Sequence, residues 1–200
     1  MRITAIPPEL QTPLRWRNGL GSTREIVRAG PQDRFTWRAS VARVDANGPF
    51  SAFPGYHRWT CLLDGGPLHL MFADDTRLTL EPRMRAHAYA GHPAPMGVLD
   101  GDFAIVFNVI AASDGLAVQV LPRTLVGSML LFDQAHTDWL IYLISGDATL
   151  RQGDQRLGLG EQHALLLQGE GRGDRAVLEG GGEVMLVRIE SAPQFTGAFG

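Results

Sequence analysis

Short apolar runs that end in glycine-containing turns recur along the chain. Residues 59–65 (WTCLLDG) and 139–146 (WLIYLISG) are continuous apolar runs, whereas residues 77–80 (RLTL) and 156–159 (RLGL) alternate polar and apolar side chains. Alternation with a period of two is typical of a half-buried strand. A stretch of helical length, residues 124–134, lacks a period near 3.6 residues. We therefore predict an all-β protein of the sandwich or barrel class.

Four short segments recur in the same order, 79 to 81 residues further along the chain. The pairs are Cys61–Gly65 with Tyr142–Gly146, Arg77–Leu80 with Arg156–Leu159, Val98–Gly101 with Val177–Gly180, and Phe107–Ile110 with Val187–Glu190. A repeat at a nearly constant offset indicates internal duplication. The turn-rich segment Ala111–Gly115 predicts the boundary, so the expected units are residues 1–112 and residues 113–200. The first unit carries an extra arm, residues 1–58, for which we expect no counterpart before the second unit.

Composition and charge narrow the classes of function. Of the 200 residues, 44% are hydrophobic and 20% are charged, as in ordinary globular proteins. A net charge of −3 without a basic stripe argues against a nucleic-acid partner. Apolar runs stay well short of the ~20 residues that span a bilayer. Residues 1–19 lack the pattern of a signal peptide, so we expect a cytoplasmic protein with no membrane partner.

Two residue counts exclude further chemistry. All 18 basic residues are arginine, which rules out a Schiff-base lysine, a pyridoxal-phosphate anchor and a Walker-type phosphate loop. Cys61 is the single cysteine, so the chain forms neither an internal disulfide nor a cysteine-based metal cage.

Polar residues that are unusual in plain strands gather in the N-terminal unit. They lie in residues 16–26 (WRNGLGSTREI), 37–42 (WRASVA), 47–58 (NGPFSAFPGYHR) and 99–110 (LDGDFAIVFNVI). The third segment is a loop braced by Pro and Gly that carries Phe50 and Phe53, and such loops at a barrel mouth are common binding elements. The fourth ends in an apolar strand that holds one amide, Asn108.

Strand periodicity predicts which of these side chains share a face. In residues 37–42, Arg38, Ser40 and Ala42 face one way, and the small residues leave room for a ligand beside the guanidinium. Thr23 and Glu25 likewise share a face, with Glu25 as an expected partner of Arg38 or Arg58. Arg58 follows the braced loop, where its donors could hold a carboxylate in bidentate geometry. A solvated face for Arg38 and a surface ion pair for Arg58 remain the alternatives.

The histidines give a weaker indication of a metal site. An H-x-H pair, which would give a metal two ligands from one face of a strand, is formed by none of the six histidines. His57 and His87 could meet across the first barrel with Glu25, and such a set would suit iron or zinc. We expect a protein without metal or other cofactor, and keep the metal site as the alternative.

Taken together, the four segments resemble the HutD/Ves family of bicupin proteins. The resemblance rests on the motifs W-x-N-G-x-G-x-T-R-E-I, W-R-x-S-x-A, G-P-F-S-x-F-P-G-x-x-R and F-N-V, in this order. They begin at Trp16, Trp37, Gly48 and Phe107 and cover roughly the first 110 residues. Three positions depart from the family pattern: Leu20 replaces a common Gly, Val106 stands where Asp is usual, and His57 where an acidic residue is frequent.

The resemblance implies two cupin-like β-barrels and a metal-free protein that is not established as an enzyme. It further implies binding of a small carboxylate metabolite, urocanate- or formylglutamate-like, and a regulatory role in histidine catabolism. The candidate ligand-binding residues are Asn18, Thr23, Glu25, Arg38, Ser40, Phe53, Arg58 and Asn108. The C-terminal barrel is expected to be structural. The alternatives are a metal-assisted isomerase or hydrolase that acts on a small acid, and an interaction module whose second barrel serves to form a homodimer.

Overall fold

The computed structural model describes residues 1–16 and 18–192, where sixteen strands and one 3-10 turn, Pro8–Leu10, make up the regular structure. The end of the expected C-terminal unit, residues 193–200, lies outside the described residues. Residues 124–134, considered above as a helix, fall mostly within strand β12. In the described part of the chain, no helix is both long and apolar enough to cross a membrane.

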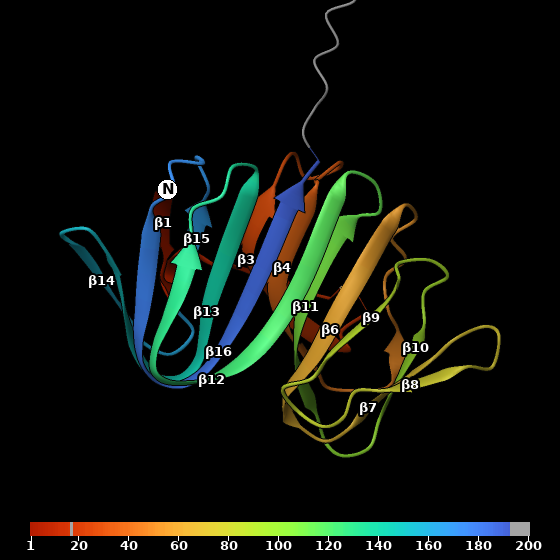
Figure 1. Ribbon diagram of the computed structural model, residues 1–200. Coiled ribbons are helices and arrows are strands. Elements are labelled where there is room, and N and C mark those ends of the chain that lie inside the picture. Colours follow the sequence, from red (N-terminus) through yellow and green to blue (C-terminus); the bar gives the residue numbers. More distant parts are fainter. Residues whose placement is uncertain (17, 193–200) are drawn as a thin grey trace, which may run out of the picture.

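The N-terminal half consists of two sheets (Figure 1). The larger, which we call the pocket sheet, has the order β2 (Thr12–Arg15), β3 (Gly21–Ala29), β4 (Trp37–Val44), β11 (Ala104–Ala112), β6 (Tyr56–Gly65) and β9 (Ala86–Ala90). The smaller, the cover sheet, has the order β5 (Gly48–Pro49), β10 (Met96–Leu99), β7 (Leu68–Met71) and β8 (Arg77–Thr79). Every pairing between neighbouring strands is antiparallel.

The C-terminal half is a single sheet of longer strands. Its order is β1 (Arg2–Ile6), β15 (Ala164–Gln168), β13 (Thr137–Gln152), β16 (Arg175–Ser191) and β12 (Leu116–Phe132), with β14 (Gln155–Leu159) paired to β13. Gly146, Gly180 and Gly182 have positive φ in the middle of these strands, and the sheet curves there (Figure 1). Glycine adopts this backbone region without steric cost, so the curved strands form both walls of their half.

Three apolar clusters connect the layers. One lies between the pocket sheet and the cover sheet and includes Leu62 and Leu70. A second joins the two halves and includes Phe107 from β11 and Met185 from β16. The third fills the C-terminal half and includes Leu143. Side chains alternate along each strand, so the pocket sheet presents one face to the cover sheet and the other to the C-terminal half.

Matching strand orders confirm the all-β architecture and show that the two halves repeat one arrangement of strands. The order β4-β11-β6-β9 corresponds to β12-β16-β13-β15. The register shifts at the same place in both halves: Leu62 pairs with Val106 and Asp64 with Ile105, as Leu143 pairs with Val184 and Ser145 with Glu183. A β-bulge of this kind is a reliable landmark for alignment.

The bulge corrects one detail of the repeat. Counted from it, Phe107 corresponds to Met185 and not to Val187, so the fourth matched segment of the sequence was displaced by two residues. A shift of two leaves every side chain on the same face of the strand, which is why the pattern still matched.

The N-terminal arm is shared between the halves. Its first strand, β1, pairs with β15 and so belongs to the C-terminal sheet, beside which Figure 1 shows it. The later strand β4 does have a counterpart, β12, contrary to the expectation that residues 1–58 have none. The hydrophobic pattern alone does not show which sheet an edge strand joins, because edge pairing is a long-range choice. The expected division at residue 112 falls between β11 and β12, with β1 as the strand that crosses it.

Candidate functional site

A cavity of about 370 Å³ opens in the N-terminal half, on the face of the pocket sheet that looks toward the cover sheet. Strands β3, β4, β6 and β11 form its floor, and the loop that follows β5 forms its opposite wall. The lining residues are Trp16, Asn18, Thr23, Arg38, Ser40, Ala42, Pro49, Phe50, Ser51, Phe53, Arg58, Asn108 and Ile110. We call this cavity the first pocket.

Strand alternation delivers the floor residues. Arg38, Ser40 and Ala42 on β4 point into the pocket, whereas Trp37, Ala39 and Val41 pack in the core between the halves. In the antiparallel register, Ser40 lies opposite Asn108 on β11, and Asn108 lies opposite Thr60 on β6. A row of polar side chains therefore crosses three adjacent strands.

Arg58 is the most deeply buried charge of the pocket, with 5% of its surface exposed. Its Nη1 donates to the Ser51 carbonyl oxygen at 3.3 Å and its Nη2 to Asn108 Oδ1 at 3.4 Å. Its Nε is buried and has no hydrogen-bond partner among the described residues. Burial lowers the pKa of Arg58, because low polarity disfavours the charged form. The guanidinium is thus desolvated and held only by neutral groups.

Aromatic rings surround that guanidinium. The Arg58 Cζ lies 5.1 Å from the centroid of Phe50, 5.7 Å from that of Phe53 and 5.5 Å from that of Tyr89. Contacts of this kind stabilise a cation by about 0.5–2 kcal/mol. They also exclude water, so they raise the strength of any ionic interaction made inside the pocket.

Arg38 is the second cation of the pocket. Its Cζ lies 4.9 Å from the Phe53 centroid, so Phe53 contacts both guanidinium groups. Burial is the main cause that lowers the pKa of Arg38; Glu25 acts against it, and the positive charge of Arg58 adds to it. Arg38 Nη1 and Glu25 Oε2 are 3.7 Å apart, a long ion pair that Glu25 also extends to Arg28 at 3.6 Å. Two cations near one ring create a positive pocket.

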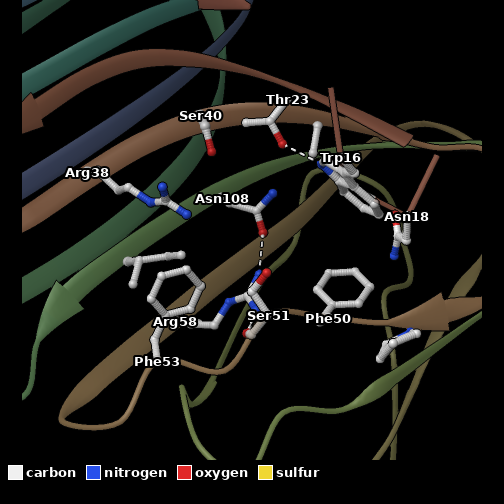
Figure 2. A pocket seen from close by; sticks show the side chains of 13 residues that line it. Trp16, Asn18, Thr23, Arg38, Ser40, Phe50, Ser51, Phe53, Arg58 and Asn108 are labelled. Carbon is white, nitrogen blue, oxygen red and sulfur yellow. Dashed lines mark hydrogen bonds between the residues drawn. The ribbon is translucent and has the colours of Figure 1, made fainter. Parts of the chain in front are cut away.

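Asn108 lies at the centre of the floor and its orientation is fixed (Figure 2). Its Oδ1 accepts from Arg58 Nη2 and, at 3.0 Å, from Thr60 Oγ1. The Thr60 hydroxyl in turn lies 2.9 Å from the Tyr89 hydroxyl. With the carbonyl oxygen engaged from the side of Arg58, the Asn108 amide nitrogen points away from Arg58, to the side of Ser40 and Thr23, as Figure 2 shows. The floor therefore offers hydrogen-bond donors.

The far end of the pocket is polar and uncharged. Trp16 Nε1 donates to Thr23 Oγ1 at 2.8 Å, which fixes the indole against the edge of Phe50. Asn18 sits at the exposed rim, and its Oδ1 accepts from the backbone N–H of Leu20 at 3.1 Å. The pocket thus has a cationic inner end and a neutral outer end.

Seven of the eight residues predicted from the sequence line this pocket. Glu25 does not; it is the ion-pair partner of Arg38, one of the two arginines that the sequence offered it. The sequence prediction missed Trp16, Ser51, Thr60 and Tyr89. Thr60 could have been found, since it is two residues from Arg58 on the same strand face. Tyr89 carries no local signal, because only the pairing of β6 with β9 brings it to the site.

The metal alternative fails on geometry for the residues proposed. His87 lies opposite Thr60 on the pocket face of the sheet, whereas His57 lies opposite Ala90, on the reverse face. His57 and Thr60 are three residues apart in β6, so their side chains point to opposite faces of the sheet. His87 shares the face of Thr60, and the two histidines therefore cannot bind the same ion. Within residues 1–16 and 18–192, no group of three or more His, Cys, Asp or Glu side chains is placed to hold a metal ion.

Comparison with known proteins gives a consistent assignment. The family model described as HutD matches residues 9–186. Protein Ves from Cronobacter sakazakii is 40% identical over 106 residues, and the match covers 52% of this chain and 58% of that protein. The match thus spans little more than half of the relative's length.

Solved structures extend the likeness to the whole fold. A conserved protein of unknown function from Pseudomonas aeruginosa PAO1, PA5104, superposes with a TM-score of 0.84 at 25% identity, covering 95% of this chain and 98% of that one. The structure of HutD from Pseudomonas fluorescens SBW25, in a formate condition, superposes with a TM-score of 0.77 at 23% identity. That match covers 96% of this chain and 100% of the other, and it shows the fold.

Proposed function

The chain belongs to the HutD family, and on that premise we propose that it binds a small carboxylate metabolite in the first pocket. One observation carries the proposal. Arg58 is a buried cation that forms no ion pair within the described parts of the chain. A charge removed from water without a counter-charge costs several kcal/mol, and a bound anion recovers that cost.

The donors around the pocket match a carboxylate better than a neutral group. In the described part of the chain, the Nε groups of Arg58 and Arg38 have no hydrogen-bond partner. Ser40 and Asn108 add neutral donors to the same pocket. Guanidinium groups bind carboxylates with short, charge-assisted hydrogen bonds. A neutral ligand would leave Arg58 without a counter-charge among the described residues, so the affinity should depend on the ligand's charge.

Size and wall chemistry favour a compact metabolite. About 370 Å³ lies near the lower end of the range of small-molecule sites. Phe50, Phe53 and Ile110 supply apolar walls beyond the cations. A urocanate-like acid, with a flat conjugated body, or a formylglutamate-like acid, with a short chain, would place its carboxylate at Arg58 and its body along these rings.

We propose binding without turnover, and through it a regulatory role in histidine catabolism. The described residues that line the first pocket include Arg, Asn, Ser and Thr but no His, Cys, Asp or Glu, the side chains that most often act as acid, base or nucleophile. Such a lining suits recognition of an anion more than its chemical conversion.

Calorimetric titration with formate, urocanate, N-formylglutamate and urocanamide tests the proposal. Urocanamide has the shape of urocanate without its charge. We expect urocanate to bind and urocanamide to bind at least about tenfold more weakly, since a charged hydrogen bond contributes about 1.5–3 kcal/mol. Equal affinity for acid and amide, or no binding of any acid at millimolar concentration, would refute it.

The variant Arg58→Met places the effect in the pocket. It keeps the length of the side chain and removes the charge, and should weaken the binding of urocanate by roughly 10- to 100-fold. Arg156→Met is the matched control, because Arg156 is exposed on β14 in the other half and should leave the affinity unchanged.

A further inference from the structure

A second and larger cavity, of about 830 Å³, lies between the two halves. The N-terminal half contributes β2, β3, β4, β6 and β11, and the C-terminal half contributes β13, β16 and the turn before β15. Much of its wall is apolar and comes from both sides: Pro13, Leu14, Val41, Leu63, Ile105 and Ile144. We call this cavity the inter-half cavity.

Arg24 faces this cavity and is not used by the first pocket. It is adjacent to Thr23 in β3, and neighbouring residues of a strand point to opposite faces of the sheet. Thr23 borders both cavities, whereas Arg24 lines only the inter-half cavity. Its Nε is buried without a hydrogen-bond partner in the described structure. Within residues 1–16 and 18–192 it takes part in no ion pair. The sequence motif T-R-E-I thus places a second uncompensated guanidinium in a cavity.

Tyr142 approaches Arg24 from the opposite half. Only 2% of its surface is exposed, and it also lines the cavity. Burial raises the pKa of the Tyr142 hydroxyl, and the neighbouring Arg24 acts against that rise. The hydroxyl therefore stays protonated at neutral pH and can donate a hydrogen bond beside the guanidinium.

The other arginines at the cavity have partners or lie at its mouth. Arg83 forms a bidentate ion pair with Glu183 of the other half, at 2.6 and 2.7 Å, and its Nε donates to the Leu63 carbonyl oxygen at 2.9 Å. Arg43 pairs with Asp45 at 2.6 Å and stacks on Phe103 at 4.1 Å. Arg15 is exposed on β2. Arg24 is the inner cation still available to an anion.

We propose that the inter-half cavity is a second binding site, for an amphipathic carboxylate whose head binds Arg24 and Tyr142 and whose apolar body packs on Leu63, Ile105 and Ile144. The volume, more than twice that of the first pocket, accommodates a ligand with a longer body. A ligand there contacts both halves at once. The two sites share Thr23 as a bordering residue but use different cations, since Arg24 lies on the face of β3 opposite to the first pocket.

Displacement of 1-anilinonaphthalene-8-sulfonate, an aromatic anion that fluoresces in apolar surroundings, tests the proposal on the intact protein. Octanoate should displace the probe, and octan-1-ol, with the same chain and no charge, should do so at least about tenfold more weakly. The variant Arg24→Met should weaken the binding of octanoate by about tenfold or more. Arg58→Met, which alters only the first pocket, should leave octanoate unchanged.

The inference is overturned if octanol displaces the probe as well as octanoate does, if Arg24→Met binds octanoate normally, or if Arg58→Met abolishes the displacement. Should Arg24→Met fail to fold, Ile144→Trp provides the test, because it fills the cavity from the C-terminal half. That variant should lose octanoate and keep urocanate, and normal octanoate binding would equally overturn the inference. Urocanate calorimetry on the same variants separates this result from the outcome for the first pocket.

Discussion

The two halves of the molecule share one arrangement of strands but place different side chains at its equivalent positions. Counted from the common β-bulge, Thr60 and Asn108 of the N-terminal half correspond to Ile141 and Leu186 of the C-terminal half. Ser40, opposite Asn108, corresponds to Leu121, opposite Leu186. Arg58 corresponds to Trp139, since each lies four residues before the bulge pair. A polar row in one half is therefore an apolar core in the other.

This contrast distinguishes the residues that the shared arrangement of strands requires from those that form the pocket. Ile141 and Leu186 are buried in the cluster that fills the C-terminal half, together with Leu165 and Leu167. Tyr142, the neighbour of Ile141 in β13, packs between the halves instead. The same strands can hold a solid core, so the hollow and its unpaired cation are not required by the fold. A destabilising feature that the fold does not require, such as this hollow with its buried cation, is typical of functional sites.

The largest effect should come from moving polarity into the filled half. Leu186→Asn introduces an amide where the neighbours are apolar, removes buried volume and leaves the new polar group without partners. We expect the free energy of unfolding to fall by about 3–5 kcal/mol. Urea denaturation measures it, with Leu130→Asn, at an exposed position of β12, as control. A loss below about 1 kcal/mol would contradict the view that this half is a packed core.

The next effect concerns the counter-charge of Arg58. Asn108→Asp keeps the shape of the side chain and places a carboxylate where Oδ1 now accepts from Arg58. The protein then supplies its own anion, so urocanate should bind roughly 10- to 100-fold more weakly. Calorimetry gives the affinity.

The stability of the same variant has a predictable pH dependence. Arg58 should depress the pKa of the new carboxyl, so the added stability is present above the unfolded value near pH 4 and disappears as the pH falls through the folded value. Thermal unfolding as a function of pH checks this sign. Unchanged affinity in Asn108→Asp would show that the ligand does not use Arg58.

A smaller effect is expected from the groups that orient Asn108. Thr60→Val removes the hydroxyl that donates to Asn108 Oδ1 and keeps the side-chain volume. A neutral hydrogen bond contributes about 0.5–1.5 kcal/mol, so affinity should fall by roughly 2- to 12-fold. Tyr89→Phe, which removes the next hydroxyl of the chain, should cost less. A larger loss of affinity in Tyr89→Phe than in Thr60→Val would contradict the view that Thr60 orients Asn108 directly and Tyr89 acts through Thr60.

The smallest effect is the titration of His87, on the pocket face of β9. Burial is the main cause that lowers the pKa of His87, and the positive charge of Arg85 lowers it further. The unfolded chain therefore binds the proton more readily than the folded one. His87 therefore reduces stability as the pH falls from about 6.5 through the folded pKa. His87→Gln should flatten the decline in melting temperature between about pH 7.5 and pH 5.5. Equal slopes in both proteins would show that His87 does not contribute.

Local patterns were enough to predict the architecture and most of the pocket. Period-two alternation correctly predicted that Arg38 and Ser40 share a face, because that geometry belongs to any strand. Long-range pairing was not accessible: Tyr89 reaches Arg58 only through the pairing of β6 with β9, and β1 crosses to the other half. The alternative metal site of His57 and His87 could be tested only with the same pairing, because the register of β6 with β9 decides which face of the sheet each histidine occupies.

The most direct test of the central claim observes the Arg58 side chain itself. Its Nε proton is buried and has no partner among residues 1–16 and 18–192, and it gives a proton–nitrogen NMR correlation that is identified by its absence from Arg58→Met. Adding urocanate should move this resonance strongly downfield, as a new charge-assisted hydrogen bond requires, and urocanamide should not. An Arg58 resonance that stays in place while urocanate binds, or that moves equally with the amide, would contradict the account.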